Sequence, residues 1–437
     1  MDQRNQINRD LSDLLVVKLG GKSLANPDRI RNLARRVIEF HETRPVMVVV
    51  SAIGNDTNRL IKLADDVSGG ECNPAELTQI VSFGENLSAN IFVAALKSLD
   101  VDAEAITTTS SKWPLFIKSD EQVALSREKI NQTVKIEIMD ELSLESVNDG
   151  LIPLLKQGTI PVVSGFLALS ENRELLTLGR GGSDTSAFLL AKLLNANEVL
   201  IITDVQGVMK ADPKLVDETR HVNYISIDEI DSVTRSGGQI LHPQSLAYKT
   251  DSMKARIVHF EESDLEDGGT EIVGFYKAKL KGIKRKLALI TIVGEDLSSH
   301  LSFWGELGHL LENFSPHLAG LSFTESFIGF YISDDAVENF YKQVSTFILD
   351  KPFIKNVAQK RGIARLNLSS RENAENPEMI SEICDVLLEK GIKVIEVITN
   401  QSDISVFVDW DDRKEAGRLF KRMATDINLH EVLKEES

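Results

Sequence analysis

Two glycine pairs, each beside a cationic residue, are the features of this sequence that most suggest chemistry. Lys18 lies just before Gly20-Gly21 at the end of an aliphatic run, and Arg180 directly precedes Gly181-Gly182. Backbone N–H groups exposed at glycine turns and at the first turn of a helix bind anions, and a guanidinium fits a carboxylate. The two clusters together predict an enzyme that handles two anionic groups.

Each pair also has a purely structural interpretation. The first is not a phosphate-binding P-loop, because Val16 occupies the position, five residues before Gly21, where that motif has glycine. It could simply turn the chain. Asp184, two residues after the second pair, could simply cap a helix, although from there its carboxylate could also reach Lys18.

A third segment, residues 203–213, follows a strand-like run. Thr203, Asp204 and Gly207 should lie at the carboxyl edge of the sheet, and Asp212-Pro213 is typical of a turn that leads back to the site. Taken alone, this segment could be an ordinary loop.

The elements that must position these residues are aliphatic runs alternating with amphipathic helices. This pattern predicts an α/β domain with a mostly parallel sheet covered by helices on both faces. Strands are expected at 14–19, 46–52, 159–166 and 198–205, and helices at 28–42, 86–99 and 185–196.

The pattern changes after about residue 281. A strand, helix, strand, strand, helix order occurs at 287–293, 305–314, 317–323, 326–333 and 335–348, and recurs at 363–369, 377–391, 392–398, 403–409 and 412–424. The basic segment 277–286 is the expected linker. These patterns predict a tail over 1–13, a first domain over 14–280 and two related units over 281–358 and 359–437.

Composition narrows the class of protein. The chain has 437 residues, 42% of them hydrophobic, and a net charge of -17, which disfavours binding to nucleic acid or anionic lipid. Cys72 and Cys384 lie too far apart in the sequence to suggest a disulfide framework or a metal site. No apolar run is long enough for a membrane span and the first thirteen residues do not resemble a signal peptide, so a cytoplasmic protein is expected.

Six segments, taken in order, resemble the motifs of the aspartokinases within the amino-acid kinase family. They are VKLGGKS (17–23), SFGE (82–85), VSGF (163–166), LGRGGSDTSA (178–187), TDVQGVMKADPKLV (203–216) and ILHP (240–243). The similarity spans roughly residues 14–260. The two C-terminal units resemble the tandem ferredoxin-like βαββαβ (ACT) domains of aspartokinases, so the expected fold is an amino-acid kinase domain followed by two ACT units.

The resemblance implies ATP-dependent phosphorylation of the side-chain carboxylate of L-aspartate, with Mg²⁺ bridging phosphate oxygens. It implies that Lys18 stabilises the transferred phosphoryl group and that Asp184 orients Lys18. The amino-acid substrate would contact Arg180 through a carboxylate and Glu85 through its ammonium group, with Ser51, Thr57, Phe166 and Ser183 around it. The nucleotide would contact Lys18, Gly20, Gly21, Thr203, Asp204, Lys210, Asp212, Pro213, Lys214 and Gln239. No residue is assigned as a protein ligand of a metal.

Several positions depart from the motifs of that family. Lys22 stands in place of threonine or serine, Asn86 in place of arginine, Met209 in place of tyrosine and Lys214 in place of arginine. Gln239 replaces a nucleotide-contacting lysine, a loss for which Lys22 or Lys210 would have to compensate. These departures leave two alternatives open: a kinase acting on another acidic amino acid, and a catalytically weak amino-acid sensor.

The ACT-like units imply feedback regulation by an amino acid such as lysine or threonine, and pairing of chains into a homodimer or a larger homo-oligomer. In the second unit, RENAEN (371–376) replaces a glycine turn, so its effector pocket could be altered. A role limited to dimerisation is the alternative.

Overall fold

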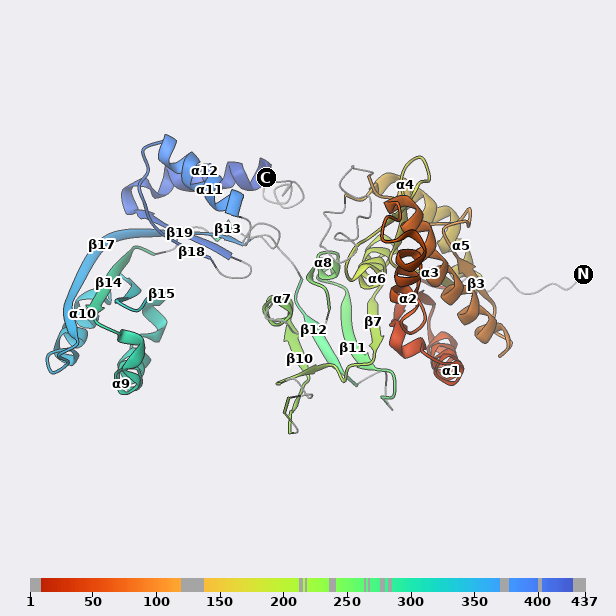
Figure 1. Cartoon of the computed structure of the whole chain (residues 1–437), viewed down its shortest axis with the longest axis horizontal. Helices are drawn as coiled ribbons and strands as arrows, with labels where there is room; N and C mark the ends of the chain where they lie inside the picture. The colour runs from red at the N-terminus through yellow and green to blue at the C-terminus, as the bar shows by residue number, and fades with distance from the viewer. Residues whose placement is uncertain are drawn as a thin grey trace, which may run out of the picture. The chain divides into compact units, whose positions relative to one another are not determined.

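The computed structural model (Figure 1) describes residues 9–118, 137–211, 215–216, 218–235, 241–262, 265, 268–275, 280–281, 285–369, 377–399 and 403–426. The chain divides into two compact units, Met1–Tyr276 and Lys277–Ser437. None of the described helices is long and apolar enough to cross a membrane.

The first unit is built on an eight-stranded sheet with the strand order β10-β12-β11-β7-β1-β2-β4-β3. Its strands are β1 (Leu15–Leu19), β2 (Val46–Val50), β3 (Ala103–Ile106), β4 (Ile160–Ser164), β7 (Glu198–Thr203), β10 (Tyr224–Ser226), β11 (Lys254–His259) and β12 (Thr270–Val273). Neighbouring strands run parallel to each other, except that β11 and β12 form an antiparallel pair. Every residue of β1, β2 and β4 is buried, which explains why these strands appear as continuous apolar runs in the sequence.

Helices and short strands surround this sheet. They are α1 (Pro27–Thr43), α2 (Asp56–Ser68), α3 (Pro74–Lys97), α4 (Asp140–Ser146), α5 (Ile152–Lys156), α6 (Gly182–Leu193), α7 (Ile227–Arg235) and α8 (Pro243–Leu246), with two hairpins formed by β5 (Leu167–Leu169) with β6 (Leu175–Thr177) and β8 (Val208–Met209) with β9 (His221–Val222). α3 begins at Pro74, capped by the side chain of Asn73, and not near residue 86 as the sequence pattern predicts. Its first half therefore carries the SFGE motif.

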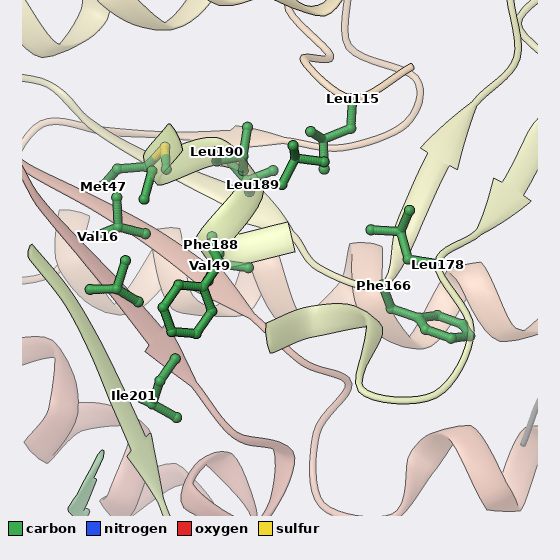
Figure 2. Packing of buried hydrophobic residues seen from close by; sticks show 14 of the residues in the cluster. Val16, Met47, Val49, Leu115, Phe166, Leu178, Phe188, Leu189, Leu190 and Ile201 are labelled. Atoms are coloured by element: carbon green, nitrogen blue, oxygen red, sulfur yellow. The ribbon is translucent and has the colours of Figure 1, made fainter. Parts of the chain in front are cut away.

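Successive side chains along the strands point to opposite faces of the sheet, so the first unit has two hydrophobic cores. Val16 of β1 joins the core that includes α6, whereas Val17 and Leu19 join the core that includes α1. Figure 2 shows Val16, Met47, Val49 and Ile201 of the strands beside Phe188, Leu189 and Leu190 of α6. The expected mostly parallel sheet, sandwiched by helices, is confirmed.

The second unit is built on a largely antiparallel seven-stranded sheet. Its elements are β13 (Leu280–Lys281), β14 (Leu287–Gly294), α9 (Leu301–Glu312), β15 (Leu318–Phe323), β16 (Phe327–Ser333), α10 (Val337–Phe347), β17 (Ile354–Ser369), α11 (Pro377–Glu389), β18 (Val394–Thr399), β19 (Asp403–Asp409) and α12 (Arg413–Asp426). The order is β15-β16-β14-β17-β19-β18, with β13 also paired to β17. The expected pair of ferredoxin-like units is recognisable, because each half has a core of strands covered by two helices.

Strand β17 is shared by both halves of this sheet (Figure 1). Its first part pairs with β14 and its last part pairs with β19 and β13. The segment 277–286 is therefore not only a linker, because Leu280–Lys281 within it form a strand of the second half. The proposed boundary between residues 358 and 359 falls inside β17 and stays a prediction.

The sheet of the second unit folds back on itself. Tyr331 of β16 and Phe407 of β19 lie three inter-strand steps apart, which would be about 14 Å in a flat sheet, yet their rings stack at 3.6 Å. Arg365 of β17 donates a hydrogen bond to the Ala319 carbonyl of β15, across the same interface. Leu287, Tyr331, Ile363 and Phe407 form a small third core of the second unit. This core joins the faces of the two sheet halves that are not covered by helices.

Candidate active site

A cavity of about 420 Å³ opens at the carboxyl edge of the parallel sheet in the first unit. It lies beyond the ends of β1, β2, β4 and β7 and is closed by α2, α3 and the first turn of α6. The sequence-predicted residues that line it are Lys18, Gly20, Gly21, Ser51, Thr57, Glu85, Phe166, Arg180, Ser183, Asp184, Thr203 and Asp204. The two glycine clusters therefore meet in one cavity.

Five other predicted residues are not among the described residues that line the cavity. Lys210 follows β8 and is exposed, and it is not among the residues that line the cavity. Asp212, Pro213, Lys214 and Gln239 lie outside the described residues, so their predicted contacts with a nucleotide stay predictions.

Lys18 and Asp184 form a nearly buried ion pair. The Lys18 side chain projects from β1 on the same face as Val16, toward α6, and Asp184 lies in the first turn of that helix. Lys18 Nζ is 2.6 Å from Asp184 Oδ1, and the two side chains are 11% and 14% exposed. The carboxylate thus holds the ammonium group at the cavity wall.

Gly21 of the first glycine pair is required by backbone packing. A Cβ on Gly21 would lie 2.4 Å from the Ala52 carbonyl oxygen, and Gly54 donates a backbone hydrogen bond to the Gly21 carbonyl. The Gly20 N–H donates to the Ile202 carbonyl, so this amide is occupied by the sheet. Gly21 thus lets the turn after β1 lie directly against the loop after β2, which shapes the cavity floor.

The second pair forms the start of α6. Gly181 has a φ of +68°, and a Cβ there would lie 2.3 Å from the Cβ of His242. A Cβ on Gly182 would lie 2.6 Å from the Phe166 ring. Phe166 itself has a φ of +69°, uncommon for an aromatic residue, and its N–H donates to Ser186 Oγ. The surroundings therefore hold a strained backbone at the cavity wall, as is often seen at functional sites.

Glu85 is the buried carboxyl group of the site. It projects from α3, its residue is 3% exposed, and its Oε2 atom has no hydrogen-bond partner among the described residues. Burial raises the pKa of Glu85 to about 8, although a backbone hydrogen bond from Ala52 and the charge of Lys18 oppose the shift. A buried acceptor without a partner, facing a cavity, suits a cationic ligand group.

Lys22 and Asp204 form a second ion pair at the cavity, with Lys22 Nζ 2.8 Å from Asp204 Oδ2. Burial opposes ionisation of Asp204, but the hydrogen bond and charge of Lys22 outweigh it, so the pKa of this carboxyl group lies below its ordinary value. Both lysines among the described lining residues therefore have an aspartate partner. Arg180, in contrast, is exposed and forms no ion pair with any described acidic residue.

The sequence prediction missed three lining residues of α2 and its N-cap, namely Asn55, Asn58 and Ile61. They follow β2, so the rule that ligands bind beyond the carboxyl ends of parallel strands could have indicated them. Lys22, which the sequence analysis names as a departure from a motif and as a candidate to compensate for Gln239, lines the cavity.

A protein-only metal site is not apparent, because the described residues contain no cluster of three histidine, cysteine or acidic side chains suited to one. Mg²⁺ in phosphate-transfer sites commonly binds to phosphate oxygens, water and only one or two carboxylates. The donor set of the cavity, with Asp184 and Asp204 beside the glycine turn, is compatible with such a site.

Comparisons with known proteins agree with this arrangement. Residues 13–259 match the model of the amino acid kinase family, more than half of the chain. Aspartokinase 2 of Bacillus subtilis is 27% identical over 418 residues, covering 92% of this chain and 95% of that protein. An aspartokinase of Mycolicibacterium smegmatis is 28% identical over 411 residues, covering 90% and 92% of the two chains.

Solved structures show the same fold. Aspartate kinase from Synechocystis aligns with a TM-score of 0.71 at 21% identity, covering 94% of this chain and 69% of that one. Escherichia coli aspartokinase III in complex with aspartate and ADP aligns with a TM-score of 0.52 at 20% identity, covering 94% and 99%. The geometry of the sheet edge and the match over residues 13–259 lead to one conclusion: the chain belongs to the amino acid kinase family.

Proposed function

We propose that this protein is an aspartate kinase, which transfers the terminal phosphoryl group of ATP to the side-chain carboxylate of L-aspartate. Its aspartokinase relatives, similar over nine-tenths of the chain, support this activity. The observation that carries it within the structure is the pattern of charges around the cavity. Lys18 and Lys22 form ion pairs with aspartates, whereas Arg180 and Glu85 form no ion pair with any described residue.

An α-amino acid complements these two groups. Arg180 offers a planar pair of N–H donors to a carboxylate, and Glu85 offers a buried carboxyl oxygen to an ammonium group. Aspartate carries a second carboxylate that would remain free to face the phosphates. Ser51, Thr57, Phe166 and Ser183 complete the wall around it.

The reaction requires positioning more than acid–base chemistry. An oxygen of the substrate carboxylate forms the new bond to the terminal phosphorus, while the bond between that phosphorus and the bridging oxygen of ADP breaks. The carboxylate is already ionised, so no protein base is needed. Lys18 stabilises the negative charge on the transferred group, and Asp184 keeps its ammonium group in place. Mg²⁺, when bound, would neutralise phosphate charge.

The test is formation of an aspartyl hydroxamate. Purified protein with ATP, Mg²⁺, hydroxylamine and aspartate should give the hydroxamate, and Lys18→Ala should lower the rate by about 10²- to 10³-fold through loss of charge stabilisation. Product from another acidic amino acid but none from aspartate would overturn the substrate assignment. Equal turnover by wild type and Lys18→Ala would instead support a catalytically weak sensor.

We also propose that the second unit binds a regulatory amino acid and that the chain forms a homodimer or a larger homo-oligomer. The two ferredoxin-like halves of its sheet support this role, with units over about 281–358 and 359–437. One comparison structure is E. coli aspartokinase III with lysine and aspartate, which makes lysine the first effector to test, followed by threonine. Inhibition of hydroxamate formation by either would support the proposal.

A further inference from the structure

Lys22 is largely exposed, yet its side chain has a defined position at the cavity. It follows the glycine turn in the short 3-10 helix Gly21–Leu24, and its side chain reaches the end of β7, 182 residues later in the sequence, to meet Asp204. The Lys22 side chain is 72% exposed, but it lines the same cavity as Gly20, Gly21 and Thr203. A long cationic side chain therefore lies at the rim of the expected phosphate site.

The other cations of the cavity have different positions. Lys18 is nearly buried and close to Asp184, which limits its movement. Arg180 lies at the second glycine pair, beside the start of α6. Lys210, a second lysine that could have served the phosphates, is not among the cavity-lining residues. Lys22 is thus the lysine at the glycine turn that remains accessible to a polyanion.

We propose that Lys22 is a second phosphate-binding cation, which Asp204 holds at the cavity rim in the free protein and which turns to the phosphates of a bound nucleoside di- or triphosphate. This inference rests on the proposed kinase function and extends it to a residue where the resemblance predicts threonine or serine. Asp204 is a positioning residue in this scheme.

The exchange of partners is physically reasonable. An ion pair between two solvent-accessible side chains is only weakly stabilising, so Lys22 can leave Asp204 with little loss. A phosphate group offers several charged oxygens in place of one carboxylate, and charge-assisted hydrogen bonds to it are strong. Lysine suits this role because its ammonium group acts as a mobile point charge on a flexible stem.

The experiment compares binding of ADP with binding of adenosine, which lacks phosphates, by titration calorimetry. Lys22→Met should weaken ADP binding by about tenfold or more, as expected when a charged hydrogen bond is removed. Its affinity for adenosine should stay that of the wild type. Lys22→Arg should retain most of the ADP affinity. Lys97→Met, which removes another exposed lysine at the end of α3, should change the affinity neither for ADP nor for adenosine.

The outcomes separate the two proposals. Unchanged ADP binding by Lys22→Met would overturn the inference and leave the kinase function standing, and so would an equal loss of ADP and adenosine affinity. A wild-type protein that binds no ADP would refute the kinase function and the inference with it. In turnover assays, Lys22→Met should raise KM for ATP and leave KM for aspartate unchanged.

Discussion

Glu85 shows how one buried carboxyl group can make substrate binding depend on pH. In the free protein, burial raises its pKa to about 8, so at neutral pH it is mostly protonated. An ammonium group binds well only to the ionised form. The affinity for aspartate should therefore increase as the pH rises toward 8, by up to about tenfold per pH unit below that pKa.

The measurement is KM for aspartate between pH 6 and pH 9, with Glu85→Gln as the matched control. The variant should bind aspartate more weakly and show no such trend. The stability of the folded protein should change with pH in the opposite direction to the affinity for aspartate. The folded state holds the Glu85 proton up to about pH 8 and the unfolded state only to about 4.5, so the free energy of unfolding should fall as the pH rises between these values. A flat KM profile for the wild type would contradict the assigned role.

Single residues also show what the sequence could and could not predict. Lys18 and Asp184 were predictable, because a strand end and a helix start next to glycines have known positions in an α/β fold. The pairing of Lys22 with Asp204 was not, because it depends on β1 and β7 being neighbours in the sheet, and the sequence does not reveal the strand order. The packing role of Gly21 could not be predicted either, and its contact with a nucleotide stays a prediction. Its contact with the Ala52 carbonyl is a matter of tertiary packing, which motif spacing does not report.

At the scale of elements, the sequence patterns identify strands that are buried and fail where a strand is exposed. The four strands predicted for the first domain match β1, β2, β4 and β7 closely, because these strands are buried on both sides. The first part of β17 was missed because residues 358–361 are all exposed, which leaves no apolar alternation to detect.

Gly362 is the point at which β17 passes from one half of the sheet to the other. It has a φ of +76° and lies at an irregularity in the pairing of β14 with β17, where Leu287 faces Ile363 and Ala288 faces Arg361. A Cβ there would meet only the Lys286 side chain, at 3.8 Å, so space is available and the backbone conformation alone requires glycine.

Gly362→Ala should therefore destabilise the second unit by about 1 to 2 kcal/mol, the usual penalty for a left-handed alanine. Gly305→Ala is the matched control. Gly305 lies in α9 and a Cβ there would meet nothing within 4 Å, so alanine should stabilise that helix by about 0.5 to 1 kcal/mol. Denaturant unfolding of the two variants should move the midpoint in opposite directions, and a shift of the same sign in both would count against this explanation.

At the scale of the whole molecule, the net charge of -17 opposes the approach of ATP and aspartate, which are anions. The cavity resolves this locally. Lys18, Lys22 and Arg180 line it together, and protonation of Glu85 removes one negative charge from the free site. Long-range repulsion is screened at physiological salt within about 8 Å, so the local cations determine binding.

The two units have separate hydrophobic cores, and we therefore expect them to unfold in two calorimetric transitions. ADP should raise the melting temperature of the first unit only, because the described residues that line the cavity proposed to bind it all belong to that unit. Phe407→Ala should lower that of the second unit only, since it removes a buried ring stacked on Tyr331, a change that typically costs about 3 to 5 kcal/mol. A single transition moved by both changes would show instead that the units unfold as one cooperative body, and the stability of the kinase site would then depend on the aromatic contact between the two halves of the second sheet.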